Sequence, residues 1–234
     1  MRKEILDQIR YLTKYFIDKG LAVNQSFPKE IGQDIIWDGC QGISFSLKMQ
    51  AYADIYDVTL SSKEYNFVFS DGGMIQMMYT FHKENMLSHR LAYYPPYDSS
   101  TPNMDEESFL NPSNKMSIPI RFDFDSDIKK FKEVVHPHTH FTLGNHEKCR
   151  IPISAPVTPF RFIDFIIRAF YMDFYESTNF KIDIVCPIKI AQTINRNENS
   201  LIHLSFQDSI NHRIVQNILN KKDYPKKSSN KKNR

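Results

Sequence analysis

The chain has 234 residues, of which 41% are hydrophobic and 24% are charged, so it is long enough to bury one sizeable core. Its 7 glycines, 12 prolines and 3 cysteines fit no collagen-like, low-complexity or disulfide-framework class. The wide spacing of Cys40, Cys149 and Cys186 favours free thiols in a reducing compartment. Because no run approaches roughly eighteen consecutive apolar residues and the first residues lack an apolar signal core, we expect a soluble cytoplasmic protein with no membrane contact.

Positive charge is concentrated at the carboxyl end. Residues 221–234 hold seven Lys or Arg residues and one Asp, so the rest of the chain is mildly acidic although the formal net charge is +3. The segment has almost no apolar side chains to bury, which predicts disorder. It would either attract nucleic acid electrostatically or only increase solubility. We therefore expect a single α+β domain over residues 1–220 and a disordered basic tail over 221–234.

The amino-terminal half predicts a helix followed by β-structure. Apolar residues recur at helical spacing over residues 3–19, and Gly20 is suited to end that helix. The turn residues Asp71-Gly72-Gly73 predict a hairpin, and the stretch after Pro95-Pro96 is expected to be a long loop. Between residues 40 and 62 the helical and strand periods are mixed. The β-rich stretches are residues 34–39, 65–81 and 87–94.

Two alternating segments follow the long loop. Residues 117–125 place Ile and Phe on one face and Arg121, Asp123 and Asp125 on the other. Residues 136–143 place three histidines on one face and Phe141 on the other. If Phe141 pairs with Ile151, then the apolar side chains share one face with Cys149, because a slip of one residue would mix the faces. The polar face would then gather His138, His140, Thr142, Arg150 and Ser154.

The remaining elements complete the predicted fold. Thr158-Pro159 opens an almost wholly apolar stretch of about seventeen residues, which predicts a buried helix against the sheet. Strands over residues 181–186 and 201–206 and a helix over 209–220 follow. The fold class is thus α+β, with a largely antiparallel sheet, a buried helix on one face and helices near both termini. Glycine-rich nucleotide-binding motifs are absent.

The histidine-rich strand admits three interpretations. In the first, His136, His138 and His140 bind a divalent metal cofactor together with Asp123, leaving an open position for water. A closed zinc site that includes Cys149 is disfavoured because that thiol lies on the opposite face. In the second, no metal is needed and the histidines act as acid and base. In the third, the polar alternation is only the solvated face of an antiparallel sheet.

The second interpretation includes a resemblance to 2H phosphoesterases. Two short strings resemble the paired signatures of that superfamily: HFTL at residues 140–143, which contains His140 and Thr142, and HLSF at residues 203–206, which contains His203 and Ser205. The resemblance implies that one histidine is the general base and the other the general acid, while the hydroxyls hold phosphate oxygens. Arg121 or Arg150 would offset the developing negative charge.

A longer series of landmarks resembles an uncharacterised bacterial family catalogued as a domain of unknown function. The landmarks are DGGMIQMMYTF, RLAYYPP, IRFDFD, HPHTHFTLG, RIPI and TPFRFIDFIIRAFY, within residues 65–175. The resemblance implies a single-domain bacterial protein with defence-related gene neighbours, and it brings no established activity. The Arg121–Asp123 strand before the histidine strand is also similar to small histidine-rich bacterial toxins.

Together these features predict a bacterial antiviral-defence or toxin–antitoxin effector that cleaves or binds RNA or DNA phosphodiesters. The alternative is a non-enzymatic subunit that docks to a co-encoded protein of a defence complex. The residues expected to act in catalysis are His140, His138, Asp123, Arg150 and His203. Those expected to bind substrate are Arg121, Thr142 and Ser205, and those expected to bind metal are His136, His138 and His140.

Overall fold

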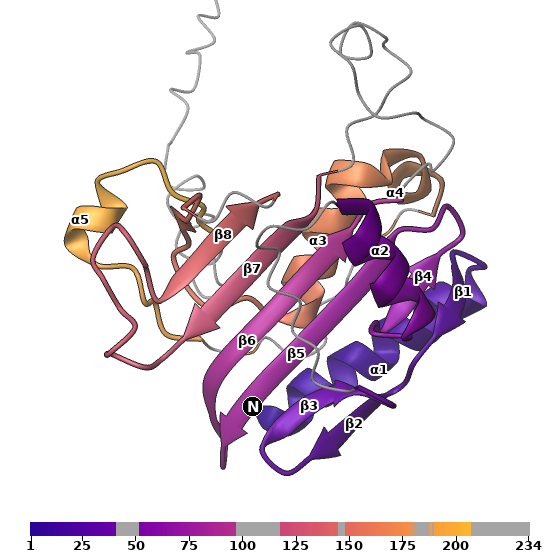
Figure 1. Cartoon of the computed structure of the whole chain (residues 1–234), viewed down its shortest axis with the longest axis horizontal. Helices are drawn as coiled ribbons and strands as arrows, with labels where there is room; N and C mark the ends of the chain where they lie inside the picture. The colour runs from indigo at the N-terminus through magenta and orange to yellow at the C-terminus, as the bar shows by residue number, and fades with distance from the viewer. Residues whose placement is uncertain are drawn as a thin grey trace, which may run out of the picture.

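A computed structural model describes residues 1–40, 52–96, 118–144, 148–178, 180, 188 and 190–206 (Figure 1). The helices are α1 (Arg2–Asp18), α2 (Tyr52–Ser61), α3 (Pro159–Phe170), α4 (Met172–Thr178) and α5 (Arg196–Asn199). The strands are β1 (Ala22–Gln25), β2 (Pro28–Ile31), β3 (Asp34–Trp37), β4 (Phe67–Phe69), β5 (Met74–His82), β6 (Asn85–Tyr94), β7 (Ile120–Asp125), β8 (Thr139–Leu143) and β9 (Ile151–Pro152).

The strands form one sheet in the order β1-β4-β5-β6-β7-β8-β9 (Figure 1). Strand β3 pairs with the far end of β5 and carries β2 on its other edge. Every strand pair within the described residues is antiparallel, and one isolated parallel bridge joins Ile153 to Leu204. The predicted α+β class with a largely antiparallel sheet is therefore confirmed.

The hairpin predicted from Asp71-Gly72-Gly73 joins β4 to β5. Gly72 has a φ of +96°, a conformation that side-chain-bearing residues rarely adopt. The carboxylate of Asp71 accepts a hydrogen bond from the main-chain N–H of Gly73 at 2.9 Å, which is the local bonding typical of Asp in turns. The turn therefore fixes the register in which Phe67 faces Ile75.

One face of the sheet is covered by α1 and α3 (Figure 1). Helix α1 has its predicted apolar stripe, with Ile9 and Phe16 fully buried. Helix α3 begins at Thr158, whose side chain accepts a hydrogen bond from the main-chain N–H of Arg161, and Pro159 occupies its first turn. The two helices meet where the side chain of Gln8 accepts a hydrogen bond from the N–H of Phe160. This face is the hydrophobic core.

On the opposite face of the sheet, the helix among the described residues that packs against it lies at one end. There α2 packs Ile55 and Tyr56 against Val68, Met74 and Tyr94, forming a second and smaller cluster. Further along β5, β6 and β7, the same face carries the polar positions. The fold thus leaves a polar surface beside a short apolar lid, and the candidate site lies there.

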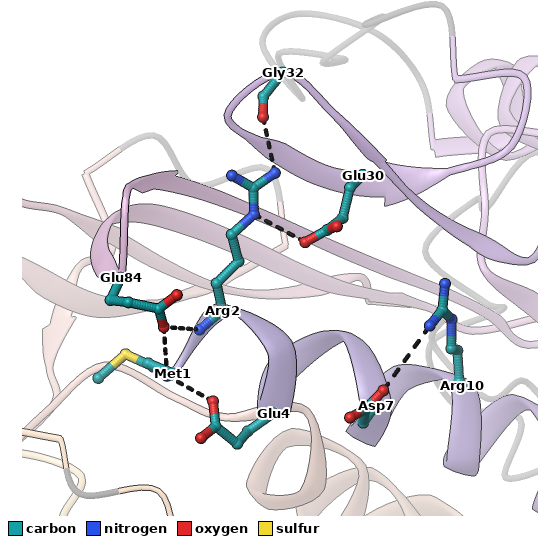
Figure 2. A network of polar contacts seen from close by, with 8 residues as sticks. All are labelled: Met1, Arg2, Glu4, Asp7, Arg10, Glu30, Gly32 and Glu84. Atoms are coloured by element: carbon teal, nitrogen blue, oxygen red, sulfur yellow. Dashed lines mark hydrogen bonds and ion pairs between the residues drawn. The ribbon is translucent and has the colours of Figure 1, made fainter.

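The start of α1 is fastened to the sheet by ion pairs (Figure 2). The Arg2 guanidinium binds the Glu30 carboxylate at 2.9 Å and the carbonyl oxygen of Gly32 at 2.8 Å, both in the β2–β3 hairpin. The amino group of Met1 contacts Glu84, in the β5–β6 turn, at 2.8 Å. These contacts connect the helix to two hairpins on one edge of the fold.

Three sequence predictions need correction. The long predicted helix is interrupted at Tyr171, where a φ of −132° and a ψ of 47° separate α3 from α4. The Tyr171 hydroxyl is held by Asp71 at 3.1 Å and by Tyr93 at 3.0 Å, which accounts for the interruption. Residues 201–206 form a single bridge rather than a strand, and Cys149 is half-buried rather than a core residue.

Several other predictions fall outside the described residues. They are the loop at 97–115, the strand at 181–186, the helix at 209–220 and the tail at 221–234. In the part of the chain that the structure describes, no helix combines the length and the apolar character needed to cross a bilayer.

Candidate functional site

The polar face of the sheet is organised by cross-strand register. His140 lies opposite Asp123, which lies opposite Arg90, which in turn lies opposite Met78. In the row on one side, Thr142 lies opposite Arg121. In the row on the other side, Asp125 lies opposite Ser88, which lies opposite Thr80. Since side chains of paired residues project from the same face of a sheet, these rows place the polar groups of β5 to β8 side by side. The predicted pairing of Phe141 with Ile151, which governs this arrangement, is confirmed.

A pocket of about 450 Å³ opens over these rows. Among the described residues that line it, four side chains are permanently positive and two are negative, which makes the pocket an electropositive site. The charged and histidine residues that line it are Arg90, Arg121, Lys130, Arg150, Asp123, Asp125, His89, His136 and His140. The structure brings five of the predicted site residues into this one pocket: Arg121, Asp123, Arg150, His136 and His140.

Asp123 lies at the centre of the pocket between two guanidinium groups. Its carboxylate binds Arg121 Nε at 2.5 Å and Arg90 Nε at 3.1 Å. Burial by itself would raise the pKa of this carboxyl, but the charges of Arg121 and Arg90 outweigh it and hold the pKa below the usual value. The carboxylate thus stays ionised and fixes the orientation of both arginines.

His140 is a buried imidazole with one nitrogen committed to the main chain. Its Nδ1 is 3.0 Å from the carbonyl oxygen of Pro137, and because a carbonyl only accepts, Nδ1 carries the proton. Nε2 is then the basic nitrogen, and it lies 3.8 Å from Asp123 Oδ2, beyond hydrogen-bonding distance. Burial lowers the pKa of His140 to about 4, partly opposed by Asp123. His140 is therefore a neutral base at pH 7.

The loop between β7 and β8 brings His136 and Lys130 to the pocket. The His136 ring lies 5.1 Å from that of His140, centroid to centroid, and its Nδ1 is 2.7 Å from the carbonyl oxygen of Lys130. In this loop Val134 has a φ of +65°, which is strained for a β-branched residue. Its main-chain N–H donates to Glu198, a buried carboxylate that also caps α5. Glu198 thus holds the loop over the site.

His138 has a different position from the one expected. It precedes β8, and its ring stacks on Phe131 with centroids 4.5 Å apart, while its Nδ1 is 2.7 Å from the carbonyl oxygen of Asp125. It does not line the pocket. Within the described ranges no three His, Cys, Asp or Glu side chains form a group that could hold a metal ion. The predicted metal set of His136, His138 and His140 does not converge, because His138 packs against the loop.

The partners expected from the 2H-like signature lie apart from the pocket. His203 and Ser205 flank Leu204, which bridges to Ile153 beyond β9, and neither lines the cavity. Ser205 is exposed. Thr142 lies next to Arg121 in the register, and its buried hydroxyl has no hydrogen-bond partner among the described residues. Of the four residues in the two signatures, His140 lines the pocket, whereas Thr142, His203 and Ser205 do not.

Two positively charged pocket residues, Arg90 and Lys130, were not among the predicted site residues. Arg90 lies in the predicted strand at 87–94, on the face opposite to that of Leu91. It could have been assigned to the site only if the pairing of β6 with β7, which sets Arg90 opposite Asp123, had been known. That pairing spans residues 95–119, and no local pattern fixes it. Lys130 reaches the pocket through the loop and binds Asp125 at 2.6 Å.

His89, beside Arg90, also borders the pocket, but its ring is held in the core. Its ring packs between Tyr79 and Phe124 on the helix-covered face, and its Nε2 accepts a hydrogen bond from the N–H of Val157 at 2.9 Å. Burial lowers its pKa to about 4. Not every histidine near the pocket is therefore a chemical group of the site.

Comparison with known proteins gives a family but no activity. No curated protein and no solved structure matches the chain. A family model described as "Uncharacterized conserved protein (DUF2290)" matches residues 21–206, a range that includes every residue lining the pocket. The suspected membership in a family of unknown function is therefore confirmed, and the chain belongs to the DUF2290 family.

Proposed function

We propose that this protein binds a nucleic-acid phosphodiester in the pocket and cleaves it by general acid–base catalysis. The observation that carries the proposal is the convergence of Arg90, Arg121 and Arg150 around a buried neutral imidazole, His140, in one electropositive cavity. Guanidinium groups bind phosphate oxygens through paired N–H donors. The imidazole beside them is neutral at pH 7 and so has an unprotonated nitrogen, Nε2, that can accept a proton.

The chemistry assigns a separate task to each group. His140 Nε2 takes the proton of an attacking hydroxyl group, and the oxygen of that hydroxyl group forms a bond to phosphorus. The bond from phosphorus to the leaving oxygen breaks, and His136 supplies the proton that this oxygen needs. The arginines stabilise the extra negative charge on the phosphoryl oxygens as it develops. Asp123 is a positioning residue, because it orients Arg121 and Arg90 and lies 3.8 Å from His140.

In a cell, such cleavage would make the protein an effector of a defence or toxin–antitoxin system. Support for this context comes from the resemblance of the sequence to bacterial toxins and from the basic segment at 221–234, which would add non-specific attraction for RNA or DNA. Binding is then expected to weaken steeply as salt increases, because each neutralised phosphate releases counterions.

The test is cleavage of labelled RNA and DNA oligonucleotides by the purified chain and by two variants. We expect His140→Ala to lower the rate by about 10²-fold or more, the usual loss for a general base. His203→Ala is the matched control, since His203 lies outside the pocket, and it should retain the rate. Cleavage by His140→Ala at the rate of the unchanged protein, or equal losses in both variants, would rule out the assigned base.

A second candidate function, an interaction subunit of a defence complex, is favoured by a different observation. Large aliphatic side chains near the loop over the site are open to solvent, with Ile202 91% exposed and Val135 64% exposed. Such side chains are typical of surfaces that contact another protein. Under this alternative, a complex with a co-encoded protein forms equally well with His140→Ala and is lost with Ile202→Asp, while neither RNA nor DNA is cleaved.

A further inference from the structure

We propose that the pocket holds one whole nucleotide, with its phosphate at the β7–β8 end and its base over Met78 at the β5 end. This inference rests on the proposed function and adds the substrate class and the residues that contact the base. It follows from how charge is distributed along the cavity.

The two ends of the pocket differ in chemistry. At the end formed by β7, β8 and the following residues, Arg121, Arg150 and His136 supply groups that bind phosphate. At the other end, the lining side chains are Met78, Thr80 and Ser88, all uncharged. A free phosphate ion would use the first end and leave the second empty. A nucleotide would use both.

The length of the site can be derived from the strand register. The row His140–Asp123–Arg90–Met78 crosses three strand-to-strand steps, and at about 4.8 Å per step it spans about 14 Å. A phosphate, a ribose and a base in sequence extend over a comparable length. The pocket volume of about 450 Å³ lies within the range of roughly 300–1,000 Å³ typical of small-molecule sites.

The side chains at the β5 end suit a base better than a second phosphate. Met78 offers a flexible, polarizable surface against which an aromatic ring can pack. The hydroxyl of Thr80 donates its proton to Asp34 at 2.7 Å, so towards a ligand it only accepts. The Asp34 carboxylate, which accepts the proton of Thr80, would repel a phosphate placed there.

The test measures binding of inorganic phosphate, ribose 5-phosphate and adenosine 5′-monophosphate to the full chain by calorimetry at low salt. We expect all three to bind, with the nucleotide at least about tenfold tighter than ribose 5-phosphate because of the base contact. Met78→Ala should weaken the affinity for adenosine 5′-monophosphate by about five- to tenfold and leave the affinity for inorganic phosphate unchanged. Met86→Ala is the control, since Met86 is on the same hairpin and packs against the core on the opposite face.

The outcomes separate this inference from the proposed function. Equal affinities for ribose 5-phosphate and the nucleotide in the unchanged protein would overturn the base site, even if His140→Ala abolishes cleavage of RNA or DNA. Loss of phosphate affinity in Met78→Ala would overturn it as well, since Met78 would then contribute only to folding. If none of the three ligands binds, both the nucleotide site and the phosphodiester function are wrong.

Discussion

The substitution Asp123→Asn tests whether the centre of the pocket is held together by charge. The amide keeps the shape of the side chain and one hydrogen-bond acceptor but removes the negative charge between Arg90 and Arg121. Two guanidinium groups then share a half-buried site without a counter-ion. We expect a clear loss of stability together with tighter binding of phosphate, which would replace the missing charge.

The magnitude follows from the geometry. Each guanidinium–carboxylate pair, with contacts of 2.5 and 3.1 Å, has a charge separation of about 4 Å, worth ~4 kcal/mol at an effective dielectric constant of about 20. The Arg90 side chain is 34% exposed, so solvent screening reduces its share. Desolvation offsets part of the rest, and we expect a net loss of ~3 kcal/mol. For a chain of this size this corresponds to a fall of about 6–12 °C in Tm.

The assay is urea unfolding at fixed ionic strength, with Asp125→Asn as the matched control. Asp125 is two residues away on the same strand and pairs with Lys130, whose side chain is 59% exposed. The same chemical change there should cost under ~1 kcal/mol, as for exposed ion pairs. If Asp123→Asn costs no more than Asp125→Asn, or if it weakens phosphate binding, then the carboxylate does not organise the arginines and the electrostatic reasoning fails.

Two further predictions concern pH and packing. Burial lowers the pKa of His140 and of His89 to about 4, whereas both histidines titrate near pH 6.5 in the unfolded chain. As the pH falls from 7 to 5, protons therefore bind to the unfolded chain first, and each histidine should lower the free energy of unfolding by ~2 kcal/mol. Urea unfolding at the two pH values measures this, and His140→Gln should remove about half of the fall; an unchanged slope would contradict it. Gly73→Ala places a Cβ 2.3 Å from the Tyr171 hydroxyl and should cost ~1–2 kcal/mol in thermal unfolding, whereas an unchanged Tm would show that Tyr171 moves freely.

The faces of the strands could be predicted because they follow a local rule. Alternation along residues 117–125 and 136–143 predicted which side chains share a face, and the pairing of Phe141 with Ile151 followed from keeping apolar groups together. These two inferences were enough to place Arg121, Asp123 and His140 in one site. They needed no knowledge of the remainder of the sheet.

The parts that could not be predicted depend on contacts between distant residues. Helical periodicity continues through Tyr171, and only the hydrogen bonds of its hydroxyl to Asp71 and Tyr93 show why the helix is interrupted there. His138 fits the two-residue alternation of His136 and His140 in the sequence, which predicts that it shares their face. Strand β8 begins only at Thr139, however, and the His138 ring stacks on Phe131 of the preceding loop instead of lining the pocket.

The position of the pocket follows from how the sheet divides its two faces. Helices α1 and α3 cover one face, so His89 is buried there and is held neutral by desolvation. Helix α2 covers only the end of the other face near Tyr94, and the polar rows continue beyond it. Arginine side chains on an open face would be mobile and their charges screened by salt, but the partly buried Asp123 fixes two of them before any ligand arrives. The energetic cost of ordering these side chains is thus met during folding, which is the condition under which a positive site binds an anion tightly and in one orientation.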